Sequence, residues 1–165
     1  MSDKEETYQF LIFVKAESVE KPSEEQLYEI IDLDKVDFPW PWDEKTWKSF
    51  LIGPRNYSLV LIYEGLNKER FVGFSLFELN FIEKQAHLYK IVICRELRGR
   101  GAAFSLFSFH RKHLTDLGLE SLYLEVAATN TSAIAFYNKC GLEVIHKKNK
   151  FYGNGDDALI MTGSI

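Results

Sequence analysis

One short stretch combines residue types suited to binding an anion: Arg98-Gly99-Arg100-Gly101-Ala102-Ala103. It follows an apolar run and precedes a segment with helical character, so it is expected to form the turn that opens a helix. The first amides of a helix lack intrahelical acceptors and carry partial positive charge, and glycine permits a close approach. Arginine adds fixed charge suited to phosphate. The stretch predicts a pyrophosphate site, although an ordinary strand-to-helix turn can have the same residues.

A second candidate for chemistry is Glu125, which lies within the apolar segment from Ser121 to Ala127. Strand alternation places this carboxylate on the face opposite Leu124 and Val126. If the side chain is buried, desolvation is expected to raise its pKa toward that of a general base working near neutral pH. A glutamate on a solvated sheet face is the alternative.

Tyr137 follows Glu125 by twelve residues, after a strand end, a turn and two turns of a predicted helix. This path returns the chain over the strand, so the phenol is expected to face the carboxylate. Core packing is the alternative for a lone tyrosine. Either Thr129 or Thr131 is expected to cap the helix.

Several other chemistries lack their residues. No Gly-Lys pair completes a P-loop, and Phe104 stands where the dinucleotide fingerprint needs glycine. His110 and His113 have neither the carboxylate nor the third ligand of a zinc site, so no metal is expected. The histidines carry no further prediction, and no Gly-x-Ser-x-Gly turn is present.

The composition is that of a globular domain of 165 residues with a net charge of −4, so residues 1–165 are expected to form a single domain. Without a basic footprint, nucleic acid is not an expected partner. No apolar run has membrane-spanning length and no signal-peptide pattern begins the chain, so a cytoplasmic location without membrane contact is expected. Cys94 and Cys140 lie among apolar residues and are predicted to be buried free thiols.

Hydrophobic periodicity and turn residues predict a mixed α/β (α+β) chain, with a central mixed, mostly antiparallel sheet of about seven strands and helices on both faces. The strands are expected at Tyr8–Val14, Tyr57–Tyr63, Arg70–Phe81, Gln85–Cys94, Ser121–Ala127, Leu142–Lys147 and Asp157–Thr162, and the helices at residues 24–36, 44–51, 103–117 and 132–139. Three of the strands, from Tyr57 to Cys94, form an antiparallel meander because their connections are hairpin-sized. Ser23 and Asp43 are predicted N-caps.

Together these residues resemble the GNAT superfamily of acetyl-CoA-dependent N-acetyltransferases, whose Gln/Arg-x-x-Gly-x-Gly/Ala signature matches Arg98 to Ala103. More closely, the chain is similar to the bacterial ribosomal-protein-alanine N-acetyltransferases. That resemblance is carried by Asn130, Ala133 and Phe136-Tyr137, by Leu124-Glu125-Val126, by Pro41-Trp42-Asp43-Glu44, and by the segment Tyr152 to Met161.

The resemblance implies a GNAT-like sheet and acetyl-CoA as cosubstrate, without a metal. It implies that Glu125 accepts a proton from the acceptor ammonium and that Tyr137 protonates the departing thiolate. The cofactor-binding residues it implies are Ile91, Val92, Ile93, Arg98, Gly99, Arg100, Gly101, Ala102, Ala103, Asn130 and Phe136. Trp40, Trp42 and Tyr152 would border the acceptor, although these aromatic residues could equally belong to the core.

The expected acceptor is the N-terminal α-amine of a protein such as a ribosomal protein, because its ordinary pKa near 7.7–8.0 allows a modest base to deprotonate it. A polyamine, amino acid or antibiotic amine is the alternative, since Ala127 stands where the family usually has arginine. A non-catalytic acyl-CoA-binding regulatory domain is a reading of another class. A monomer or weak dimer is expected.

Overall fold

A single mixed sheet organises the molecule, a computed structural model that describes residues 14–65 and 70–165. Its strands are β1 (Val14–Val19), β2 (Tyr57–Glu64), β3 (Arg70–Asn80), β4 (Gln85–Ile93), β5 (Ser121–Ala127), β6 (Glu143–Lys148) and β7 (Ala158–Ser164). The helices are α1 (Glu24–Asp37), α2 (Glu44–Ile52), the 3₁₀ turn η2 (Arg95–Leu97), α3 (Ala102–Asp116) and α4 (Thr131–Lys139). Among these described helices, none is long and apolar enough to cross a bilayer.

The strands lie in the order β1-β2-β3-β4-β5-β7-β6. β4 and β5 pair in parallel, and the other neighbouring strands pair antiparallel. The predicted seven-stranded, mostly antiparallel sheet is therefore confirmed. The predicted strand Tyr8–Val14 lies outside the described residues except for its last position, where β1 begins.

Capping residues and other short sequence patterns predicted most of the helices and strands. Ser23 Oγ accepts from the amide of Gln26 at 3.1 Å, and the Gln26 side chain accepts from the amide of Ser23 at 2.9 Å, which completes the predicted capping box of α1. Asp43 caps α2 by accepting from the amide of Thr46. From Ser23 onward the predicted helices and strands are confirmed, with ends that differ by a residue or two.

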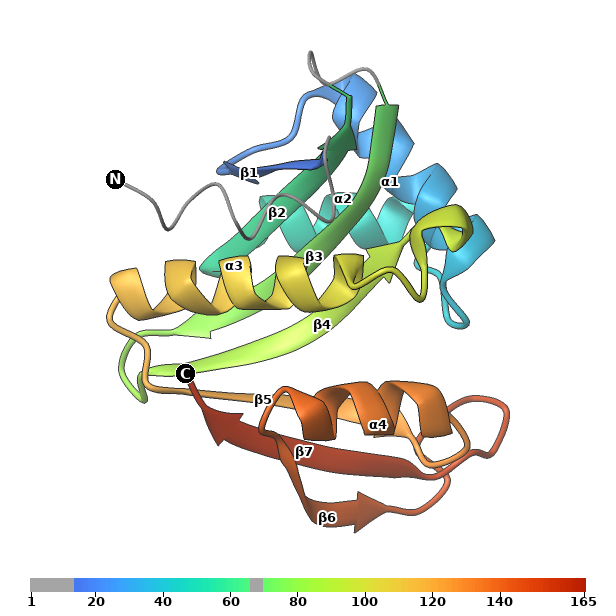
Figure 1. The fold of residues 1–165 in the computed structure, drawn as a ribbon, viewed down its shortest axis with the longest axis vertical. Helices are drawn as coiled ribbons and strands as arrows, with labels where there is room; N and C mark the ends of the chain where they lie inside the picture. The colour runs from blue at the N-terminus through green and yellow to red at the C-terminus, as the bar shows by residue number, and fades with distance from the viewer. Residues whose placement is uncertain (1–13, 66–69) are drawn as a thin grey trace.

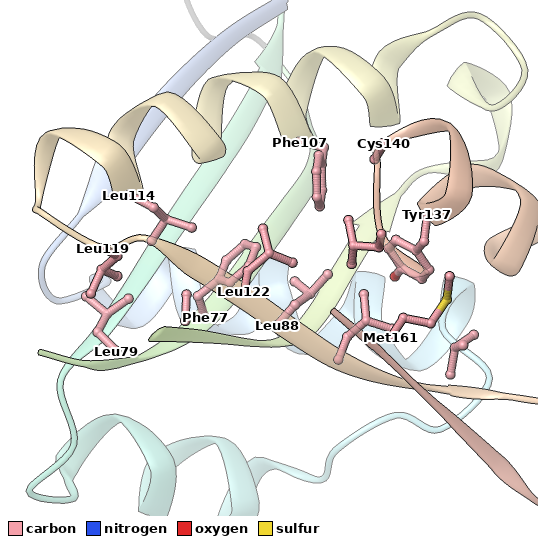
Figure 2. Packing of buried hydrophobic residues seen from close by; sticks show 14 residues of the cluster. Phe77, Leu79, Leu88, Phe107, Leu114, Leu119, Leu122, Tyr137, Cys140 and Met161 are labelled. Carbon is pink, nitrogen blue, oxygen red and sulfur yellow. The ribbon is translucent and has the colours of Figure 1, made fainter. Parts of the chain in front are cut away.

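Helices cover both faces of the sheet, as predicted. In Figure 1, α3 and α4 lie in front of the sheet and α2 lies behind it. Residues of α1 and α2, among them Ile30 and Trp47, pack on one face of β2, β3 and β4. On the other face, α3 and α4 pack over β3, β4, β5 and β7, and Figure 2 shows Phe107, Tyr137 and Met161 in this second cluster. Both cysteines are buried and free, as predicted.

A bulge in β4 opens the sheet in its middle. Leu88 pairs with Phe77 of β3 and Lys90 pairs with Leu76, so Tyr89 is an extra residue without a partner on β3. Bulges bend a strand and increase its twist. The ladder between β4 and β5 ends at the same point, because Leu88 and Leu124 are its last pair. Beyond them the two strands diverge, toward the right of Figure 1.

Candidate active site

The divergence of β4 and β5 leaves a cavity of about 740 Å³ between them. One wall is the end of β4 and the other is the end of β5, while the loop after α1, the start of α3, α4 and the segment before β7 close the sides. Most of the predicted site residues line this cavity: Trp40, Trp42, Ile91, Val92, Ile93, Arg98, Gly99, Ala103, Glu125, Asn130, Phe136, Tyr137 and Tyr152. Arg100, Gly101 and Ala102 do not.

The turn before α3 has the conformation expected of an anion cradle. Gly99 and Gly101 have φ values of +73° and +83°, in the left-handed region that favours glycine. Gly101 is the N-cap and offers no side chain to the first amides of the helix. Within the described residues, the amides from Gly99 to Phe104 donate to no backbone oxygen, since the first such bond comes from Ser105. These groups are thus available to an anion.

The end of β4 also has unpaired main-chain groups. Residues from Tyr89 to Ile93 have no partner on β5, although they remain paired with β3 on their other edge or lie in the bulge. An extended ligand can add to such an edge through main-chain hydrogen bonds. The free edge runs toward the cradle at the start of α3, so the two features form one continuous wall of the cavity.

Arg98 is held by the protein itself. Its Nε donates to the carbonyl of Ile93 at 3.0 Å, and one Nη donates to the carbonyl of Asp37 at 2.7 Å. The same Nη lies 3.2 Å from the Asp37 carboxylate. The side chain thus joins the end of α1 to the end of β4, and part of the charge expected to face a phosphate is neutralised by Asp37.

Glu125 lies in a charged cluster built from three strands. Its Oε2 is 2.6 Å from Nε2 of His87 on β4, and its Oε1 accepts from Nζ of Lys148 on β6 at 3.3 Å. The hydrogen bond from His87 lowers the pKa of the Glu125 carboxyl below its usual value, and Lys148 adds to this effect through its hydrogen bond and its charge. Desolvation acts in the opposite direction and does not prevail. The expectation of a raised pKa was wrong, because polar partners accompany the burial.

His87 is the residue that sequence reasoning missed. Its side chain is 17 % exposed and lines the cavity. The ring stacks on Tyr123 with centroids 4.3 Å apart and contacts Tyr89 at the same distance. No local motif marks this histidine. The signal that reveals it is the strand register, which places His87 opposite Tyr123 and therefore beside Glu125.

Tyr137 extends from α4 into the cluster beneath that helix (Figure 2). Burial raises the pKa of its phenol, so the hydroxyl stays protonated at neutral pH. The hydroxyl makes no hydrogen bond within the described part of the chain. Every fully buried side-chain oxygen or nitrogen there has a partner, so this hydroxyl is not fully buried. It is therefore accessible from the cavity that Tyr137 lines.

Glu125 and Tyr137 approach the cavity from opposite faces of the sheet. Leu124 and Val126 pack with Tyr137 under α4, whereas alternation turns Glu125 to the other face with Tyr123. The expectation that the phenol lies over the carboxylate on one face was wrong. The two side chains border the same cavity only because the sheet is open between β4 and β5.

Aromatic residues close the side of the cavity that Glu125 faces. Trp40 stacks on Tyr152 with ring centroids 4.4 Å apart, which joins the loop after α1 to the segment before β7. Burial raises the pKa of Tyr152 to about 12. Trp42 contacts Trp47, Phe50 and Tyr89 and belongs largely to the core. Trp40 and Trp42 both line the cavity, and contact of either with an acceptor stays a prediction.

Asn130 caps α4, where a threonine was expected. Its Oδ1 accepts from the amide of Ala133 at 3.2 Å and from the hydroxyl of Ser132 at 3.1 Å. The expected cap at Thr129 or Thr131 was wrong, because asparagine occupies the position before the first helical residue. Asparagine is as favourable at an N-cap as serine or aspartate. Asn130 and Phe136 both line the cavity beside the free edge of β4.

Comparison with known proteins assigns this arrangement to a family. Residues 27–142 match the family described as "Acetyltransferase (GNAT) family". The chain belongs to the GNAT acetyltransferase family. The resemblance noted from the signature at Arg98 to Ala103 is confirmed by this match.

Curated relatives include proteins with different acceptors. The N-alpha-acetyltransferase of Saccharolobus solfataricus is 32% identical over 91 residues, 54% of each chain. The spermidine N(1)-acetyltransferase of Vibrio cholerae is 35% identical over 82 residues, 48% of this chain and 47% of the relative. The [ribosomal protein bS18]-alanine N-acetyltransferase of Escherichia coli is 28% identical over 125 residues, 74% of this chain and 80% of the relative. The chain thus spans about half the length of the first two relatives.

Solved structures share the fold. The ribosomal-protein-S18-alanine N-acetyltransferase from Escherichia coli superposes with a TM-score of 0.79 at 24% identity, over 92% of this chain and 94% of that one. A chain of the NatC complex bound to Gag peptide and CoA gives a TM-score of 0.79 at 15% identity, over 93% and 99%. Family and fold therefore agree, while the acceptor differs among relatives.

Proposed function

We propose that this protein transfers the acetyl group of acetyl-CoA directly to a primary amine, and that the amine is the N-terminal α-amine of a protein. The observation that carries the proposal is the single cavity between β4 and β5. It joins an anion cradle, a free strand edge, a phenol and a hydrogen-bonded carboxylate.

The cofactor side of the cavity fits acetyl-CoA. The amides from Gly99 to Ala103 would hold the pyrophosphate, and the exposed edge from Ile91 to Ile93 would bind the pantetheine arm. Asn130 and Phe136 would border that arm from α4. The amide near Ile93 would stabilise the negative charge that develops on the thioester oxygen.

The two proton transfers take place on opposite sides of the sheet. Glu125, with the side chains hydrogen-bonded to it, is the basic group on the acceptor side, and Tyr137 is the acid on the cofactor side. The amine nitrogen attacks the acetyl carbon, the carbon–sulfur bond breaks, and the phenol protonates the thiolate. Direct transfer is expected because the described residues that line the cavity include no activated nucleophile.

The charges in the cavity favour an α-amine, which carries one positive charge, over a polyamine. Among the described residues that line it, the carboxylates are those of Asp37 and Glu125, and each is paired with a cation of the protein. A polyamine carries several positive charges and would find few unpaired anions there. An α-amine needs only one basic group and an uncharged groove for the following residues.

Acetyl transfer to a panel of amines tests the proposal, with CoA release as the readout. Peptides with free N-termini are expected to be acetylated, while the same peptides with blocked N-termini and internal lysine are not. Transfer to spermidine but not to peptides would replace the proposed acceptor. Binding of acetyl-CoA without CoA release for any amine would identify a regulatory domain instead.

A further inference from the structure

The pair formed by His87 and Glu125 has the geometry of a base and its orienting carboxylate. Both side chains are largely buried, with 17 % and 16 % of their area exposed, and the donor and acceptor atoms are 2.6 Å apart. The rings of Tyr89 and Tyr123 both contact the imidazole, which restricts its rotation. A role of this pair in proton transfer depends on the proposed function, acetyl transfer to an amine.

Both oxygens of Glu125 are already engaged. Oε2 meets the imidazole of His87, and Oε1 meets the ammonium of Lys148. A carboxylate with two such donors is ionised and can only accept hydrogen bonds. Nε2 of His87 must then carry the proton in their shared bond. Whenever the imidazole is neutral, its lone pair therefore lies on Nδ1.

The Nδ1 atom of His87 is accessible. It has no hydrogen-bond partner among the described residues. Every fully buried side-chain nitrogen in that part of the chain does have a partner. An unbonded Nδ1 must therefore be open to solvent. Because His87 lines the cavity between β4 and β5, an amine entering there can reach the atom directly or through one water.

We propose that Nδ1 of His87 accepts the proton from the acceptor ammonium, and that Glu125 is the positioning residue that holds the imidazole through Nε2. The N–H bond of the ammonium breaks, an Nδ1–H bond forms, and the resulting imidazolium is stabilised by the carboxylate. The amine then attacks the acetyl carbon. The proton lost as the amide forms replaces the one that Tyr137 gives to the thiolate, and the imidazolium releases its proton to solvent.

The pH dependence of this step is set by several neighbouring groups. A neutral imidazole can accept a proton on its unbonded nitrogen, whereas the pKa of the Glu125 carboxyl is lowered by its partners. The titratable and charged side chains that face the imidazole or its carboxylate come from β3, β4, β5, β6 and the segment before β7: Glu78, Tyr89, Tyr123, Glu125, Lys148 and Tyr152.

Kinetics of the full chain with a peptide acceptor test the assignment. His87→Gln keeps a hydrogen-bonding amide but no base, so it should lower kcat by ~10²–10⁴-fold and leave the KM for acetyl-CoA unchanged. Imidazole should restore turnover to His87→Ala, in proportion to its neutral fraction as pH rises. The control is His146→Gln, at an exposed position on β6, and should behave as the wild type. Full kcat in His87→Gln, with activity lost only in Glu125→Gln, would overturn the proposal.

A substrate-free measurement separates this proposal from the proposed function. Nitrogen-15 spectra of histidine-labelled protein, assigned by loss of the His87 signals in His87→Gln, should show Nε2–H and an unprotonated Nδ1. The opposite tautomer in an active enzyme would overturn the role of His87 alone. A wild-type protein that acetylates no amine would instead overturn the proposed function.

Discussion

Nζ of Lys90 lies 2.8 Å from Oδ1 of Asp34, and both side chains are almost completely buried. The lysine also donates to the carbonyl of Trp40 at 3.1 Å. The other oxygen of Asp34 accepts from the amide of Trp42 and from Nε1 of Trp47, each at 2.9 Å. One ion pair therefore fixes the loop whose Trp40 lines one side of the cavity.

Removing the cation should destabilise the protein strongly. Lys90→Met leaves the Asp34 carboxylate buried without a counter-charge, which typically costs about 3–5 kcal/mol. Urea unfolding measures this loss. Lys48→Met, which breaks the exposed pair with Glu44, is the control and should leave the midpoint unchanged. Adding Asp34→Asn to Lys90→Met should recover stability, and an unchanged midpoint in Lys90→Met alone would contradict the argument.

The two ends of α3 allow a matched test of the anion cradle. Gly101 and Gly118 both have φ of +83°, and a Cβ at either would meet nothing within 4 Å. Gly101→Glu and Gly118→Glu therefore bear the same backbone strain. Only the first places a negative charge at the cradle, so its Kd for acetyl-CoA should rise about tenfold or more, a cost of at least ~1.4 kcal/mol. Calorimetry that finds equal affinities for both variants would rule out the cradle.

Tyr137→Phe should separate binding from turnover. The ring that packs under α4 is retained, so affinity for acetyl-CoA and stability should change little. Loss of the acid should lower kcat by ~10²–10⁴-fold at every pH below that at which the phenol ionises, because burial raises its pKa. Tyr57→Phe is the control, since that hydroxyl binds the carbonyl of Glu20 outside the cavity. Wild-type turnover in Tyr137→Phe would remove the phenol from the mechanism.

His110 should make the fold sensitive to acid. Its Nε2 contacts the hydroxyl of Ser58 and its Nδ1 that of Ser75, and burial lowers the pKa of the imidazole to about 3. Between the ordinary value of 6.5 and that pH, the unfolded chain binds a proton that the folded chain does not. The contribution of His110 to the free energy of unfolding is therefore fully present above pH 6.5. Below that pH the free energy of unfolding falls by up to ~1.4 kcal/mol per pH unit.

Urea unfolding between pH 7 and pH 5 measures this slope. His110→Gln does not titrate in this range, so it should lose less stability on acidification than the wild type, even if it is less stable at pH 7. His146→Gln, at an exposed position, should follow the wild-type slope. Parallel curves for the wild type and His110→Gln would show that the imidazole is protonated in the folded state.

Local signals were sufficient for most of the fold. Caps at Ser23 and Asp43, the left-handed glycines around α3 and alternating apolar residues all act over a few positions, so the sequence predicts them directly. The bulge at Tyr89 had no such signal. It follows from how β3 and β4 pair, and it decides where the sheet opens.

The candidate site was predicted less completely, because its electrostatics depend on distant residues. Glu125 was identified, but the partners that lower its pKa lie 38 and 23 positions away in the sequence. His87 was passed over because no motif around it indicates a role. Only strand order and register bring it to the carboxylate.

The opening between β4 and β5 connects the two faces of the sheet within the described part of the chain. If the two substrates bind as proposed, they enter from opposite sides and meet only at the reacting atoms. Neither has to leave for the other to arrive, so acetyl-CoA and the acceptor should not compete. A bulky folded acceptor can then present its first residues on the Trp40 side, while the nucleotide remains docked behind.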